Sequence, residues 1–281
     1  LESKMITIAA WKNDKSGIGH YTRAENYFKF LRTKNKKVEI FTFKNLRDLF
    51  DKIKYKKSNT ILIDTYVFSK KIEILLRKNF KKVIIINDYQ FKLPKDFHLL
   101  DPFKFYKKID HKNFFFGQEY SPISYNKTYT FNKSKKTNDL LIVLNNKYQK
   151  KFYEINKLII KKFKNKIIVN VKSNEIKNFL KSTKNYIIKS FVSEKILLNY
   201  ANKSKYIISP GGQTMMNLVE HNQFINVYKT SKNQSFYINE LDKKRYINKI
   251  DFSKFSLKKN KIINYNKKTK KNKLLKIFTN G

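Results

Sequence analysis

Glycine is scarce in this sequence, and its positions mark the segments best suited to chemistry. Only six of the 281 residues are glycine, and one of them is the last residue. Glycine permits positive φ and close approach of the backbone to a ligand, so in a glycine-poor chain we expect the remaining glycines to meet such needs. The other five lie in three loops: Gly17 and Gly19, Gly117, and Gly211 with Gly212.

The first of these loops combines two glycines with a histidine and an arginine. Gly17-Ile18-Gly19-His20-Tyr21-Thr22-Arg23 follows a strand candidate and opens a helix candidate. Backbone N–H groups at a helix start attract an anion. The third glycine of a dinucleotide motif and the Lys-Ser/Thr of a P-loop are both missing. His20 therefore offers the most direct chemistry, proton transfer, although a histidine here can also cap or pack the helix.

A second strand-turn-helix loop lies in the other half of the chain. It reads Ser209-Pro210-Gly211-Gly212-Gln213-Thr214. Two glycines before a helix suit a diphosphate resting on the helix N-terminus, but such a pair also occurs in structural turns. Asn233-Gln234 follow the next strand candidate, either as ordinary loop residues or as groups that reach the same ligand.

Metal, thiol and cofactor chemistry find no support in the composition. The chain has no cysteine, which excludes disulfides, a catalytic thiol and any Cys-ligated metal. His98, His111 and His221 show no metal-ligand spacing with acidic residues. We expect neither a metal nor another cofactor.

The net charge of +42 comes mainly from lysine. Only five of the 63 basic residues are arginine, and abundant Lys, Asn, Ile and Phe are typical of a protein encoded by an AT-rich genome. Nucleic-acid readers generally use arginine for bidentate contacts, so we expect a solvated lysine surface and no specific nucleic-acid partner. The segment 254–273 is the one basic cluster, and it leaves polyanion binding open.

Short apolar runs alternate with longer amphipathic segments, which predicts β-α-β units and parallel sheets. Strands are expected at 6–10, 38–43, 60–64, 83–87, 139–144, 166–171, 186–190, 206–209 and 224–228, and helices at 20–33, 45–55, 69–79, 148–164, 174–181, 193–202, 212–222 and 236–243. The polar segment 121–138 interrupts this alternation. We therefore predict an α/β fold of two Rossmann-like doubly wound domains facing a cleft, residues 1–135 and 136–281, the second including the basic tail.

The apolar runs are all too short to span a membrane, and the first ten residues lack a signal-peptide pattern. Hydrophobic residues make up 41% of the chain, which favours a folded protein despite its charge. These features predict a cytoplasmic protein. Leu1–Lys4 precede the first methionine and are expected to be a remnant of expression or the edge of a longer protein.

Taken together, the segments resemble the UDP-2,4-diacetamido-2,4,6-trideoxy-β-L-altropyranose hydrolase family of pseudaminic acid biosynthesis (PseG-like). That family is a GT-B-like relative of the murein glucosaminyltransferase. Its G-x-G-H-x-x-R motif is matched fully by residues 17–23. Its other motifs resemble, in order, Asp64-Thr65-Tyr66, Asp88, Gly117-Gln118-Glu119-Tyr120, Ser209–Thr214 and Asn233-Gln234.

The resemblance implies hydrolysis of a UDP-linked 2,4-diacetamido-2,4,6-trideoxy sugar, without a metal, for flagellin or surface glycans. It implies that His20 positions or deprotonates the attacking water while Tyr66 and Asn233 hydrogen-bond sugar or water. The residues that it assigns to substrate or nucleotide binding are Gly17, Gly19, Arg23, Asp88, Gly211, Gly212, Gln213, Thr214, Asn217 and Gln234. The chain departs from the family at Asn217, where glutamate is usual, and at Asn145-Asn146, where Gly-Gly is usual.

Other functions remain open at this point. A GT-B-type glycosyltransferase would use the same nucleotide-sugar donor, with an acceptor hydroxyl in place of water. A noncatalytic protein would bind a nucleotide-sugar without turnover, or would bind a polyanion through the basic tail.

Overall fold

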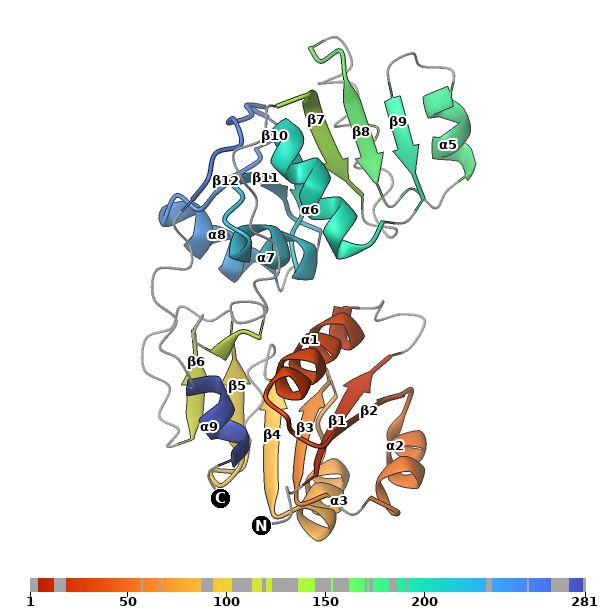
Figure 1. Ribbon diagram of the computed structural model, residues 1–281, viewed down its shortest axis with the longest axis vertical. Helices are drawn as coiled ribbons and strands as arrows, with labels where there is room; N and C mark the ends of the chain where they lie inside the picture. The colour runs from red at the N-terminus through yellow and green to blue at the C-terminus, as the bar shows by residue number, and fades with distance from the viewer. Residues whose placement is uncertain are drawn as a thin grey trace. The chain divides into compact units, whose positions relative to one another are not determined.

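The structure is a computed structural model, and it divides the chain into two compact units (Figure 1). The first unit is Leu1–Lys127 together with Lys268–Gly281, and the second is Thr128–Lys267. The structure describes residues 5–12, 19–56, 58–65, 67–86, 93–102, 113–117, 120–122, 136–144, 153, 162–169, 171, 174–181, 186–190, 192–230, 234–251, 253–263 and 273–279.

The first unit is built on a parallel sheet of six strands in the order β2-β1-β3-β4-β5-β6. The strands are β1 (Ile6–Trp11), β2 (Val38–Phe43), β3 (Thr60–Asp64), β4 (Lys82–Ile86), β5 (His98–Asp101) and β6 (Phe114–Phe116). The chain moves from β1 to β2 on one side and then to β3 on the other. The strand order therefore reverses between β1 and β3, and a ligand site is expected beyond their carboxyl ends.

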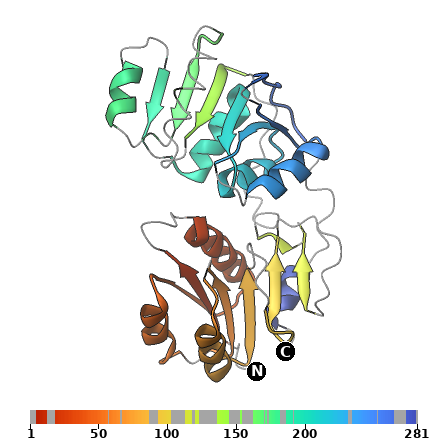
Figure 2. The ribbon, with the colours of Figure 1, turned by 180° about the vertical axis from the view of Figure 1, so that it is seen from behind.

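Helices cover both faces of this sheet (Figures 1 and 2). On one face, α1 (Gly19–Thr33) packs its Ala24, Tyr27, Phe30 and Leu31 against inward-facing residues of β1, β3 and β4. On the other, α2 (Leu46–Ile53) and α3 (Lys70–Asn79) bury their apolar faces against the alternate residues of the same strands. Burial of both faces explains why these strands are nearly continuous runs of apolar residues.

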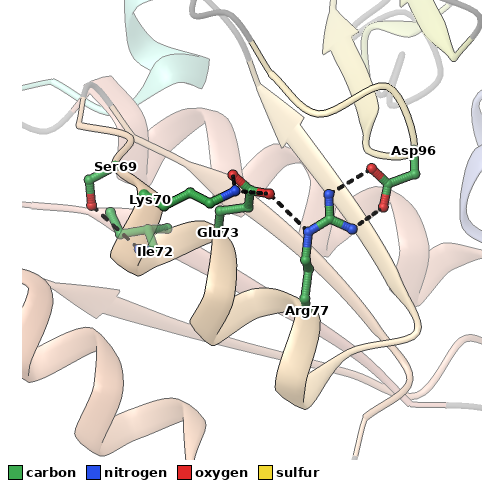
Figure 3. A network of polar contacts seen from close by, with 6 residues as sticks. All are labelled: Ser69, Lys70, Ile72, Glu73, Arg77 and Asp96. Carbon is green, nitrogen blue, oxygen red and sulfur yellow. Dashed lines mark hydrogen bonds and ion pairs between the residues drawn. The ribbon is translucent and has the colours of Figure 1, made fainter.

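Local side-chain contacts define where α2 and α3 begin. The side chain of Asn45 caps α2 by accepting from the Asp48 N–H, and the side chain of Ser69 caps α3 by accepting from the Ile72 N–H. Figure 3 shows that Glu73 then accepts from Lys70 and Arg77, and that Arg77 donates through two nitrogens to Asp96. This exposed network ties α3 to the segment that leads into β5.

The last helix, α9 (Lys273–Thr279), belongs to the first unit. Its residues Leu274, Ile277 and Phe278 are buried in the core formed by α1 and the sheet, and the Phe278 ring lies 6.3 Å from that of Tyr27. The prediction that all of 136–281 belongs to the second domain is therefore wrong for this helix. Its three buried apolar residues lie on one helical face, and that face is buried against α1.

Because α9 completes the first unit's core, a small change in it is expected to weaken that unit. Ile277→Val should lower the free energy of unfolding by about 0.5–1.5 kcal/mol, the usual effect of removing one buried methylene. The single tryptophan, Trp11, lies in β1 and reports this unit's unfolding in urea by fluorescence. Ile74→Val is the matched control, because Ile74 is 57% exposed on α3. Equal stabilities of the two variants would contradict the packing of α9 in the core of the first unit.

The second unit has its own parallel sheet, in the order β12-β11-β10-β7-β8-β9. Its strands are β7 (Asn138–Val143), β8 (Lys166–Val169), β9 (Tyr186–Lys189), β10 (Ser204–Pro210), β11 (Ile225–Tyr228) and β12 (Ile247–Lys249). Its helices are α5 (Asn174–Lys181), α6 (Glu194–Lys203), α7 (Gln213–Glu220) and α8 (Ser235–Lys243). The strand order reverses between β7 and β10, so the loops after these two strands flank the switch point.

The two doubly wound sheets confirm the predicted α/β fold. The helix predicted over 148–164 falls almost entirely outside the described residues. Within the described part of the chain, none of the helices has the length and apolarity needed to cross a membrane.

Candidate active site

The histidine and the arginine of the first loop share one face of α1. His20 is the second residue of the helix and Arg23 lies three residues later, so the two side chains project on the same side. Both are buried, His20 to 2% exposure and Arg23 to 6%. Gly17 lies outside the described residues, while Gly19 begins the helix.

Both side chains contact Asp64, the last residue of β3. His20 Nδ1 lies 2.6 Å from Asp64 Oδ1. Arg23 donates from Nε to Asp64 Oδ2 at 2.7 Å and from Nη2 to Asp64 Oδ1 at 2.6 Å. The parallel register of β1 and β3 pairs Ala10 with Asp64, which places the carboxylate beside the end of the strand that leads to α1. The cluster therefore lies at the first unit's switch point.

Asp64 is held in its ionised form. Complete burial alone would raise the pKa of its carboxyl, because burial disfavours the charged form. The charge of Arg23, with a further contribution from His20, outweighs burial and lowers the Asp64 pKa below its usual value. A buried carboxylate that receives a two-pronged arginine pair also has a fixed orientation.

Asp64 is the residue of this cluster to which the sequence motifs assign no role. It appears there only as part of the Asp64-Thr65-Tyr66 match. An acidic residue at the carboxyl end of a buried strand next to the first strand was the available signal. Arg23 was assigned to substrate binding, and its observed partner is Asp64.

In the second unit, the predicted Gly211-Gly212 turn joins β10 to α7 and flanks the switch point. Gly211 N–H donates to the Tyr228 carbonyl at 3.0 Å, which fastens the turn to β11. Gly212 has φ of 96°, a conformation that favours glycine, and it is the residue that precedes α7. The glycine pair thus meets a backbone requirement, whatever ligand binds there.

Gln234 lies against this glycine pair. Its Oε1 accepts from both the N–H and the hydroxyl of Thr230, at 2.9 Å each. A Cβ added to Gly211 would lie 2.6 Å from that oxygen. Packing against the turn is therefore the observed role of Gln234, and its predicted contact with nucleotide stays a prediction.

Gly211→Ala is expected to lower the free energy of unfolding by about 1–3 kcal/mol, because the new methyl group displaces Gln234 from Thr230. Urea unfolding followed by circular dichroism measures it. In a Gln234→Ala background, Gly211→Ala should lower the free energy of unfolding by less. Equal losses in both backgrounds would contradict the contact between residue 211 and Gln234. Gly19→Ala is the control, because a Cβ there would meet nothing within 4 Å.

The first turn of α7 contains the remaining residues assigned to the nucleotide. Gln213 donates from Nε2 to Asn217 Oδ1 at 2.7 Å, which orients the residue that stands where the resembling family usually has glutamate. Thr214 is partly buried beside them. Nothing in these contacts assigns a ligand, so their binding roles stay predictions.

Several predicted site residues fall outside the described part of the chain. Tyr66, Asp88 and Asn233 are among them, as are Asn145-Asn146. The described residues contain no group of three acidic or histidine side chains that could hold a metal ion. His98 lies on β5 with its ring stacked 5.7 Å from that of Phe115, away from the His20 cluster in sequence.

Comparison with known proteins adds information at the level of the fold. No family model matches the chain, and no curated protein sequence matches it. A UDP-GlcNAc 2-epimerase of Methanocaldococcus jannaschii, in complex with UDP-GlcNAc and UDP, has a similar structure with a TM-score of 0.60 and 11% identity. The similarity covers 88% of this chain and 89% of the epimerase.

MurG of Acinetobacter baumannii is similar with a TM-score of 0.59 and 10% identity, over 90% of this chain and 87% of MurG. The chain has a GT-B-like fold. A third similar structure, Staphylococcus aureus MnaA with UDP, has a TM-score of 0.55 and 10% identity, over 84% of this chain and 82% of MnaA. At such identities the GT-B-like similarity describes the fold and leaves the residues of the site to be argued on their own.

Proposed function

We propose that the chain is an enzyme acting on a nucleotide-sugar, and that it hydrolyses a UDP-linked 2,4-diacetamido-2,4,6-trideoxy sugar to UDP and free sugar. The observation that carries the proposal is the buried cluster of His20, Arg23 and Asp64 at the carboxyl ends of β1 and β3. The GT-B-like fold supports it, because two of the similar structures contain UDP. The full match of residues 17–23 to G-x-G-H-x-x-R supports hydrolysis in particular.

In the proposed reaction, water attacks the anomeric carbon of the sugar and His20 takes the water's proton. The bond between that carbon and the diphosphate oxygen breaks, and its electron pair leaves with UDP. A positioned base of this kind typically accelerates a reaction by about 10²- to 10⁴-fold. Open space beside Gly19 supports a close approach of substrate to the helix start, since the fold itself does not require glycine there.

The second unit is proposed to bind the UDP part of the substrate. The N–H groups at the start of α7 favour a negative charge and would stabilise the leaving diphosphate. Gly211, Gly212, Gln213 and Thr214 form this helix start, with Asn217 and Gln234 beside it. Tyr66 and Asn233 are proposed to hydrogen-bond the sugar or the water, and Gly17 and Asp88 to contact the substrate.

Nucleotide binding can be tested separately from turnover. UDP at about 100 times its Kd is expected to stabilise the protein by about 2.7 kcal/mol, and ADP at the same concentration by less. Thermal unfolding in the presence of each nucleotide measures the difference. Equal stabilisation by UDP and ADP would contradict the uridine assignment.

Turnover separates the proposed hydrolase from the two alternatives. UDP release from the UDP-sugar alone supports hydrolysis, whereas release only after an acceptor is added identifies a glycosyltransferase. Polyanion binding is tested by replacing the exposed Lys254, Lys258, Lys259 and Lys261 with glutamine. This variant keeps α9, and binding driven by phosphate contacts would weaken both with the substitution and with added salt.

A further inference from the structure

The contacts of Asp64 determine which nitrogen of His20 carries the proton. We propose that Asp64 is a positioning residue that holds a proton on Nδ1 of His20, so that Nε2 is the nitrogen that accepts a proton. The catalytic consequence rests on the proposed function. The position of the proton itself does not, and it can be measured on the protein without substrate.

Asp64 is the acceptor in its contact with His20. Asp64 is completely buried and pairs with Arg23 through both carboxylate oxygens. An ionised carboxylate has no proton to donate and can only accept. At 2.6 Å from Asp64 Oδ1, His20 Nδ1 must therefore be the donor of their hydrogen bond.

A contact with Arg23 argues the other way. Its Nη2 lies 3.5 Å from His20 Nδ1, and a guanidinium nitrogen can only donate. That distance exceeds the usual range of about 2.7–3.2 Å for N–H hydrogen bonds. The same Nη2 donates to Asp64 Oδ1 at 2.6 Å, so the shorter contacts decide the proton's position.

The surroundings also fix the orientation of the ring. Asp64 ends a central strand and His20 begins a helix packed on that sheet, so both partners stand on rigid elements. Arg23 prevents the carboxylate from rotating away, because rotation would break two further hydrogen bonds. In a neutral imidazole protonated on Nδ1, the basic lone pair is on Nε2. Asp64 therefore selects the nitrogen that would receive the proton of water.

The test is nuclear magnetic resonance of the full chain with ¹⁵N-labelled histidine. The chain has four histidines, and a His20→Asn sample identifies the His20 signals by their loss. As the pH is raised until His20 has lost one proton, we expect Nδ1 to stay protonated and Nε2 to be the unprotonated nitrogen in the wild type. A neutral ring with its proton on Nε2 would overturn the proposal without any variant having to fold.

Asp64→Asn tests whether the carboxylate is responsible. The asparagine side chain can accept or donate, so the two neutral forms of His20 should both be populated, and kcat should fall by about 10²- to 10⁴-fold with KM little changed. Asp96 is an exposed carboxylate in the same unit, and Asp96→Asn should change neither the proton position on His20 nor kcat. An unchanged proton position in Asp64→Asn would overturn the proposal. A proton on Nδ1 in a protein that releases no UDP from UDP-sugar would support it and refute the proposed function.

Discussion

Replacing His20 with asparagine is expected to lower kcat for the UDP-sugar by about 10²- to 10⁴-fold, while UDP still binds. The expectation follows from assigning to His20 the removal of a proton from water. Asparagine is the suitable replacement, because its amide can still donate to the buried Asp64 carboxylate and so limits the loss of stability. Initial rates of UDP release, together with UDP binding by calorimetry, measure the two effects separately.

His98→Asn is the matched control for this variant. It makes the same substitution in the same unit, on β5, at a ring that stacks on Phe115 and has no assigned role in the reaction. Its kcat should stay near the wild-type value. Full activity of the His20→Asn variant would remove His20 from the mechanism and leave the cluster a structural link between α1 and β3.

Asp64→Ala is expected to lower the free energy of unfolding of the first unit by about 3–5 kcal/mol. The substitution removes the carboxylate that pairs with the buried Arg23, and breaking a buried ion pair by removing one member is strongly destabilising. Urea unfolding followed by Trp11 fluorescence measures the loss.

The same unit offers a matched pair for comparison. Asp96 also accepts two hydrogen bonds from an arginine, Arg77, but the two side chains are 58% and 42% exposed (Figure 3). Water screens such a pair, so Asp96→Ala should lower the free energy of unfolding by only about 0.2–1 kcal/mol. Similar losses for Asp64→Ala and Asp96→Ala would contradict the burial of the cluster. The double replacement Arg23→Met with Asp64→Leu should recover much of the loss.

The central strands and their helices were predictable because burial on both faces makes each strand a dense apolar run. The expected strands at 38–43 and 60–64 match β2 and β3, and the helix expected at 174–181 matches α5. The missed elements lack this signal. β5 and β12 have only four and three residues, and they are positioned by pairing with a neighbouring strand.

α9 was missed because lysines dominate the surrounding sequence. Its apolar residues at 274, 277 and 278 have helical spacing, yet nothing local indicates that they pack in the first unit. Membership of a domain depends on contacts between residues far apart in sequence, which a local pattern does not contain.

The same limit applies to the candidate site. The motif predicted a catalytic His20 and a substrate-binding Arg23, and their spacing on a helix explains why they share a face. Their partner Asp64 is separated from them by 44 and 41 residues, and only the register of β1 with β3 brings it close. The glycines divide in a similar way: the fold requires Gly212, whereas only an approaching ligand would require Gly19.

The most direct test of the central claim is a product balance in the absence of any acceptor. The purified chain is mixed with the UDP-linked 2,4-diacetamido-2,4,6-trideoxy sugar in buffer, and UDP and free sugar are quantified over time. We predict that both appear in equal amounts over many turnovers. Binding of the UDP-sugar without release of UDP, or release only after an acceptor is supplied, would contradict the proposed hydrolase.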